Sequence, residues 1–231
     1  MAVEITKGKP HPPSRFLIMG EPFSGKTTLA AKAPKPLFIS TDGNAAKAGL
    51  DAVNVESVQD VRDALALVHK HKEYKTVVID TIEGVVDMLT SEVLAEYQNS
   101  GYKTADGGQI QSLQDVPFGK ATGNLNSRVE KLANSLAKVD RNIIIISYTK
   151  RRIDDVSGSI VLDSELKNIR FFTRFMDVQI LTSYDGEKHK AEVIGKRETM
   201  AGDADLTGIK DFLNAAGWER PKRSVKLGST K

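Results

Sequence analysis

Residues 20–27 have the types and spacing of a phosphate-binding loop. They read Gly-Glu-Pro-Phe-Ser-Gly-Lys-Thr, which matches the Gly-x-x-x-x-Gly-Lys-Thr form of a P-loop. In such a loop backbone amides surround the phosphates, Lys26 reaches the β- and γ-phosphates, and Thr27 ligates Mg²⁺. A chance glycine-rich turn is disfavoured because the flanking strand and helix patterns also fit. We therefore expect ATP to be bound by Gly20, Glu21, Pro22, Phe23, Ser24, Gly25, Lys26, Thr27 and Thr28.

Asp80 is the second candidate for metal chemistry. It ends an apolar segment, Thr76-Val-Val-Ile, in the form of a Walker B strand, and open α/β sheets bind ligands at the carboxyl ends of their strands. The carboxylate would hold Mg²⁺ through the water around the ion. An aspartate at this position is also a common helix cap, and only the P-loop upstream favours the metal role.

Hydrolysis also needs a group that orients or deprotonates the attacking water, and we expect it at the end of a strand beside the P-loop strand. Asp42, which follows the apolar segment 36–40, is the candidate. The alternative is a turn residue, because Asp-Gly sequences favour turns. A run of four isoleucines ends at Ser147, Tyr148 and Thr149, one of which could place a hydroxyl near the γ-phosphate as a sensor. The alternative is an ordinary hydroxyl at a strand end.

The elements that must position these residues alternate between strand and helix patterns. This alternation predicts an α/β fold with a mostly parallel sheet flanked by helices. A C-terminal β-hairpin is expected around the turn at 184–187. Residues 99–124 lose all periodicity and predict a long glycine-rich loop. Strands are expected at 16–19, 36–40, 52–55, 76–80 and 142–147, and helices at 58–68, 82–97 and 125–139.

The composition suits one large domain with short appendages. The chain has 231 residues, 40% of them apolar, and a net charge of +3 that does not by itself imply nucleic acid. The absence of cysteine excludes disulfides and a cysteine-based zinc site. Without an apolar run of ~20 residues or a signal sequence, we expect a cytoplasmic protein. The expected organisation is a flexible arm at 1–14, a core at 15–217 and a basic tail at 218–231.

The order of these parts resembles the RecA-like ATPase core, and specifically the compact RecA-like ATPases of bacteriophages that act in single-strand annealing or recombination. The resemblance covers about residues 15–215. It implies a Mg²⁺-dependent ATPase acting on single-stranded DNA, in the cytoplasm of a bacterial host. It also implies a homo-oligomer, ring or filament, and as a further partner a single-strand DNA-binding protein.

The resemblance also implies roles for particular positions. Asp42 falls where the family carries its catalytic carboxylate, usually Glu, and Ser147 falls within its sensor segment. Lys196 and Arg197 correspond to basic residues that reach the nucleotide of a neighbouring subunit. Segments 99–124 and 150–168 occupy the places of the two DNA-binding loops, where Tyr102 or Phe118 could stack a base. The implied DNA contacts are Lys103, Lys120, Lys150, Arg151 and Arg152.

Several alternatives stay open from the residues alone. The acidic residues among the loop cations would also fit a solvated, charge-mixed surface. A P-loop kinase of small molecules is disfavoured because no arginine-rich lid segment stands out. A scaffold that binds ATP but hydrolyses little of it is permitted by the short Asp42 side chain. A GTPase is disfavoured because no Asn-Lys-x-Asp motif occurs.

Overall fold

The computed structural model describes residues 14–153 and 160–196. The arm before Ser14, Arg197 and the basic tail at 218–231 lie outside the described residues. Within the described ranges, no helix combines the length and the apolar character needed to cross a lipid bilayer.

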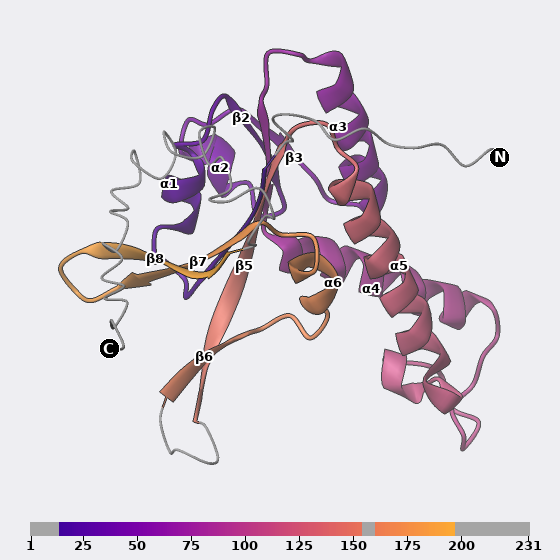
Figure 1. The fold of residues 1–231 in the computed structure, drawn as a ribbon. Coiled ribbons are helices and arrows are strands. Elements are labelled where there is room, and N and C mark those ends of the chain that lie inside the picture. The colour runs from indigo at the N-terminus through magenta and orange to yellow at the C-terminus, as the bar shows by residue number, and fades with distance from the viewer. Residues whose placement is uncertain (1–13, 154–159, 197–231) are drawn as a thin grey trace, which may run out of the picture.

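Strands and helices alternate along most of the chain (Figure 1). The strands are β1 (Arg15–Gly20), β2 (Pro36–Ser40), β3 (Ala52–Asn54), β4 (Thr76–Asp80), β5 (Asn142–Ile153), β6 (Ile160–Ser164), β7 (Val178–Tyr184) and β8 (His189–Lys196). The helices are α1 (Lys26–Ala30), α2 (Asn44–Lys47), α3 (Val58–Lys70), α4 (Ile82–Asn99), α5 (Lys120–Ala137) and α6 (Arg170–Thr173), with 3₁₀ turns η1 (Leu113–Asp115) and η2 (Pro117–Gly119).

The strand order in the sheet is β3-β2-β4-β5-β1-β7-β8. Neighbouring strands from β3 to β7 run parallel, while β8 returns antiparallel to β7. The predicted α/β class, with a mostly parallel sheet and a C-terminal hairpin, is confirmed. Because β3, β2, β4, β5, β1 and β7 are parallel, their carboxyl ends lie at one edge of the sheet. The P-loop follows β1 at that edge, and Asp80 ends β4 there.

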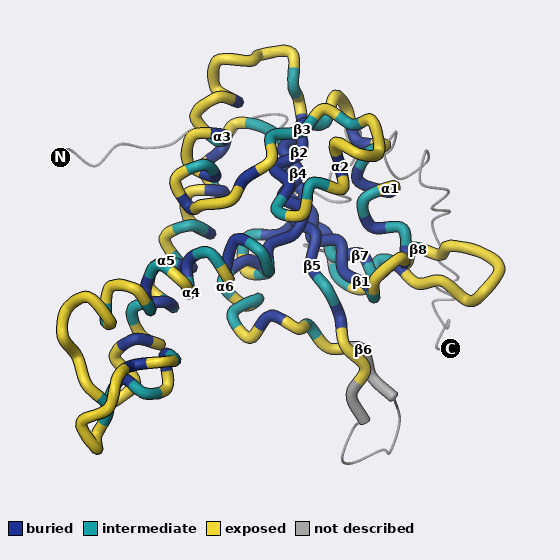
Figure 2. The backbone as a smooth tube through the Cα atoms, turned by 180° about the vertical axis from the view of Figure 1, so that it is seen from behind, coloured by how far each residue is buried: buried dark blue, intermediate teal, exposed yellow. Residues whose placement is uncertain are grey.

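Helices cover both faces of the sheet. Figure 1 shows α1 and α2 on one side and α3, α4 and α5 on the other. Alternate residues of each strand enter opposite cores: Phe16, Ile18 and Ile144 pack on the side of α1, while Leu17 and Ile145 pack on the side of α4. Figure 2 shows this buried centre and the mostly exposed segment at the outer end of α4 and α5. The central strands are therefore fixed from both sides.

Two segments expected as loops contain regular structure. Residues 99–124 hold η1 and η2, and α5 already begins at Lys120. Leu113 and Val116 are buried against the larger core, which anchors this segment. The charged segment after Ser147 continues β5 and pairs antiparallel with β6, so a hydrogen-bonded ladder stands where the resemblance implied a loop. This segment has many charged residues, so it lacks the apolar alternation that would have predicted a strand.

Candidate functional site

The P-loop is fixed to its own strand and to β7. Gly20 has no room for a side chain, because a Cβ there would collide with the hydroxyls of Ser24 and Thr182. Those two hydroxyls are hydrogen-bonded at 2.7 Å, and Thr182 also donates to the Met19 carbonyl at 3.1 Å. Gly25 has a φ of 90°, which favours glycine. The loop residues between β1 and α1 are thus held in a defined path.

Lys26 is buried at the centre of this loop. Its Nζ donates to the Gly20 and Glu21 carbonyls at 3.0 and 2.8 Å, and it lies 4.3 Å from the centroid of the Tyr148 ring. Burial lowers the Lys26 pKa, against the opposing effect of nearby acids, the first of them Asp80. The ammonium group is therefore a desolvated cation with only weak carbonyl partners, which anionic oxygens would replace favourably.

Thr27 and Asp80 meet although 53 residues separate them. The Thr27 hydroxyl donates to Asp80 Oδ2 at 2.8 Å. The pKa of Asp80 is raised to about 6, chiefly by burial and also by the charge of Asp42, against the lowering effect of the Thr27 hydrogen bond. A buried carboxylate that is costly to charge gains from a nearby cation. These two oxygens fit the metal side of a P-loop site.

A metal at this position would need ligands beyond the protein. Among the described residues, no group of three or more acidic or histidine side chains could hold an ion alone. Mg²⁺ commonly uses one or two protein oxygens and completes its shell with water and phosphate. Thr27 and Asp80 are suited to that arrangement.

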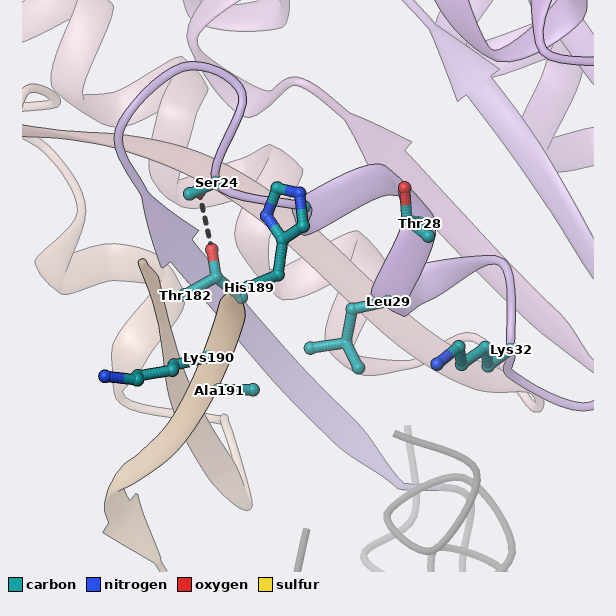
Figure 3. A pocket seen from close by; sticks show the side chains of 9 residues that line it. Ser24, Thr28, Leu29, Lys32, Thr182, His189, Lys190 and Ala191 are labelled. Atoms are coloured by element: carbon teal, nitrogen blue, oxygen red, sulfur yellow. Dashed lines mark hydrogen bonds between the residues drawn. The ribbon is translucent and has the colours of Figure 1, made fainter. Parts of the chain in front are cut away.

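Two adjoining pockets open beside the start of α1. One, of about 450 Å³, is lined by Phe23, Gly25, Thr27, Thr28, Tyr184 and His189. The other, of about 240 Å³, extends along α1 to Leu29 and Lys32 (Figure 3). The rings of Tyr184 and His189, on opposite strands of the β7–β8 hairpin, lie 4.7 Å apart. A flat apolar group that leaves the P-loop on this side would meet these rings.

Asp42 does not lie on a strand beside β1, so this expectation is wrong. Its strand, β2, is separated from β1 by β4 and β5. The exposed Asp42 carboxylate is occupied by its own turn, accepting hydrogen bonds from the Asn44 amide at 2.9 Å and the Asn44 side chain at 2.7 Å. Order in the chain could not reveal this, because the sheet inserts β5 between the strands that lead to Lys26 and Asp80.

Ser147 is buried at the sheet edge, and its partner is a residue that the sequence did not single out. Its hydroxyl donates to Glu83 in the first turn of α4 at 2.5 Å. Burial raises the pKa of Glu83, while the hydrogen bonds from Ser147 and the Tyr148 amide lower it. One sequence signal was available, since Glu83 follows Asp80 at the ligand-binding edge. Tyr148 had the same signal as Ser147, the end of the four-isoleucine strand, whereas His189 offered none.

Arg151, one of the DNA candidates, contacts the P-loop. Its Nε and Nη2 donate to the two carboxylate oxygens of Glu21 at 2.7 and 2.9 Å. Lys150 beside it is exposed, and Arg152 follows on β5. Lys103 and Lys120 are exposed at the outer end of α4 and α5, which lies apart from β6 in both Figure 1 and Figure 2. The structure does not bring the two predicted DNA segments together.

Lys196 ends β8 on the far side of the hairpin, and Arg197 lies outside the described residues. In register, Lys196 pairs with Val178, which pairs with Phe16 near the start of β1. The P-loop follows the other end of β1. The backbone of Lys196 therefore lies at the edge opposite its own P-loop.

Comparisons with known proteins identify one family. A profile of the family described as "AAA domain" matches residues 13–177. Among solved structures, one whose title describes it as an ATPase domain is similar, with 12% identity and a TM-score of 0.46, over 80% of this chain and 78% of that one. No curated protein matches the sequence.

Proposed function

This chain belongs to the AAA domain family, and from that premise we propose that it binds ATP with Mg²⁺ at the P-loop and hydrolyses the ATP. One observation carries the proposal: the Thr27 hydroxyl donates to Asp80 Oδ2 at 2.8 Å, beside the buried Lys26. P-loop enzymes use a hydroxyl and an acid of this kind around their metal. A chance glycine-rich turn gives no reason for a buried acid 53 residues away to contact its threonine.

Each part of the loop then has a defined task. Lys26 exchanges the carbonyls of Gly20 and Glu21 for oxygens of the β- and γ-phosphates, where its charge is better matched. Backbone amides from Ser24 to Thr28 donate to the phosphates. Thr27 would hold Mg²⁺ directly and Asp80 would hold it through water, and the ion would supply neutralising charge for the transferring phosphoryl group.

The nucleoside would occupy the pockets beside α1. The larger pocket begins at Gly25 and Thr27, where the phosphates bind, and ends at the rings of Tyr184 and His189. Its volume of about 450 Å³ falls in the range of small-molecule sites. Paired rings 4.7 Å apart offer an aromatic surface for a base. This continuity from phosphate cradle to aromatic surface supports a nucleotide over a bare phosphate.

We further propose that turnover is coupled to single-stranded DNA, in recombination or replication of the kind that the resemblance implies. Exposed aromatic rings beside cations are the combination that single-strand binders use. Phe118 is 96% exposed, and Lys120 Nζ lies 6.0 Å from the centroid of the Tyr102 ring on the same segment. Lys150 adds an exposed cation on β5. These features support DNA contact at two separate places.

A homo-oligomer with a shared active site extends the proposal. Lys196 lies at the sheet edge opposite its own P-loop, so a direct role in hydrolysis requires the P-loop of a neighbouring subunit. A cation supplied in trans stabilises the charge that develops as phosphate is transferred. Arg197, next in sequence, would share this task.

Phosphate release from ATP tests these assignments together. The chain is assayed in Mg²⁺ and in EDTA, with and without single-stranded DNA. We expect release that requires Mg²⁺ and increases with DNA. Release that DNA leaves unchanged would remove the coupling but keep the ATPase. ATP binding without release would favour the nucleotide-dependent scaffold, and transfer of phosphate to an added metabolite would favour a small-molecule kinase.

A further inference from the structure

Glu83 reaches from the first turn of α4 to the end of β5, the strand that lies between β1 and β4. Its Oε1 accepts hydrogen bonds from the Ser147 hydroxyl at 2.5 Å and from the Tyr148 amide at 2.9 Å. These donors are 64 and 65 residues away in the sequence. Tertiary packing, and not a local turn, therefore sets the position of this carboxylate.

The second oxygen of the carboxylate has no such partner. Glu83 Oε2 is buried and accepts no hydrogen bond from any described residue. The Thr81 hydroxyl has a small effect that lowers the Glu83 pKa. It does not form a hydrogen bond with Oε2. Leaving a buried polar atom unpaired destabilises the folded protein. Such an atom is explained if its partner arrives with a ligand.

Glu83 also lies within the electrostatic reach of the P-loop. Its charge raises the pKa of Lys26 and that of Asp80, as do other acids of the site. Tyr148, whose amide donates to Glu83, presents its ring to Lys26 Nζ at 4.3 Å. The carboxylate, the phosphate-binding lysine and the metal-side acid therefore belong to one site.

We propose that Glu83 is a catalytic residue of ATP hydrolysis, and that its Oε2 orients the attacking water and accepts a proton from it. This inference rests on the proposed function. The water oxygen bonds to the γ-phosphorus while the bond from that phosphorus to the β–γ bridging oxygen breaks. The bond electrons leave with ADP, and one water proton passes to Glu83 Oε2. No oxidant, reductant or further reactant is needed.

Ser147 is then a positioning residue. Its buried hydroxyl holds Oε1, which leaves Oε2 as the oxygen available to water. The charged groups that act on this site are Lys26 of α1 and the acids Asp80 of β4, Asp42 of the turn after β2 and Glu165 beyond β6, with the phenol of Tyr148 beside them. An anchored carboxylate needs little reorganisation during reaction, which is how such groups accelerate hydrolysis.

The variant Glu83→Gln keeps the size of the side chain but cannot accept the proton. Measuring both its kcat and its ATP dissociation constant therefore separates an effect on the reaction from an effect on ATP binding. We expect kcat for phosphate release to fall by ~10²-fold or more, the usual scale for a general base, with the ATP dissociation constant changed less than about threefold. Glu92→Gln is the matched control, because it makes the same change on the same helix. The Glu92 carboxylate pairs with Arg128. This variant should keep wild-type turnover.

Ser147→Ala gives a second measurement that does not depend on the folding of Glu83→Gln. Loss of its hydrogen bond, which lowers the Glu83 pKa, should move the acid limb of the kcat profile to higher pH and lower kcat by roughly tenfold. Wild-type protein without phosphate release would overturn the proposed function itself. The assignment of Glu83 alone would be overturned by either of two results in an active wild-type background. One is a kcat of Glu83→Gln within threefold of wild type, and the other is a pH profile of kcat for Ser147→Ala that matches wild type.

Discussion

The turn after β2 and the first turn of α4 each carry one acid at the same edge of the sheet, but the two acids have different partners. Asp42 is exposed and bonds to Ser40 and Asn44, each two residues away. Glu83 is half-buried and bonds to β5, more than sixty residues away. A carboxylate with only local partners stabilises a turn, whereas one held across the sheet is available for chemistry at a fixed place.

Asp80 sharpens this comparison, because it is buried and ionisation of its carboxyl group destabilises the folded protein. We expect Asp80→Asn to stabilise the metal-free protein at pH 7.5 by on the order of 1–3 kcal/mol, since its pKa is raised to about 6. The native state then holds the proton more tightly than the unfolded state, so the penalty on wild type falls as the pH drops from 7 toward 4. The gain of the variant should disappear over the same range.

Thermal unfolding in EDTA measures this effect. A gain of that size raises Tm by roughly 2–10 °C at pH 7.5. Asp87→Asn, an exposed acid on α4, is the control and should change Tm little. If Asp80→Asn were less stable than wild type at pH 7.5, the ionised Asp80 carboxylate would not destabilise the metal-free protein, contrary to this account. The same variant should also lose Mg²⁺-dependent turnover.

The contrast between local and distant partners also separates two neighbouring cations. Lys150 is exposed, whereas Arg151 is held by Glu21 of the P-loop, 130 residues away. We expect Lys150→Ala to lower the slope of log affinity for single-stranded DNA against log salt by ~0.7, the value of one phosphate contact. Arg151→Ala should change this slope less. An equal loss of slope in both variants would show that the Glu21 pair yields to DNA.

The smallest effect is expected at Asp42. Asp42→Asn preserves an oxygen acceptor for the Asn44 amide, so the turn should persist. We expect kcat to change less than about threefold, measured beside Glu83→Gln under the same conditions. A loss of ~10²-fold or more would return the role of general base to Asp42.

Much of the fold was predictable because local patterns determine it. β2 and β4 match the predicted ranges 36–40 and 76–80, since each is an apolar run with clear boundaries. The sheet order could not be predicted, because pairing depends on which faces pack after the chain folds. The extension of β5 to Ile153 was missed since its charged residues give no apolar alternation.

The candidate site divides in the same way. The contiguous residues of the P-loop were identified from one motif, and Asp80 from the strand that precedes it. Glu83 was not identified, because its partners Ser147 and Tyr148 lie on β5, the strand that the sheet places between β4 and β1. Residues assembled across a sheet leave no fixed spacing in the sequence.

The most direct test of the account is the equilibrium binding of Mg²⁺-ATP to wild type and to Lys26→Ala. Lys26 is the buried cation at the centre of the loop, and its only hydrogen bonds in the described residues go to the loop carbonyls of Gly20 and Glu21. We predict saturable binding by wild type, a dissociation constant raised ~10²-fold or more in a folded Lys26→Ala protein, and no phosphate release by the variant. Equal affinity and equal turnover in the two proteins would contradict an ATP site at this loop.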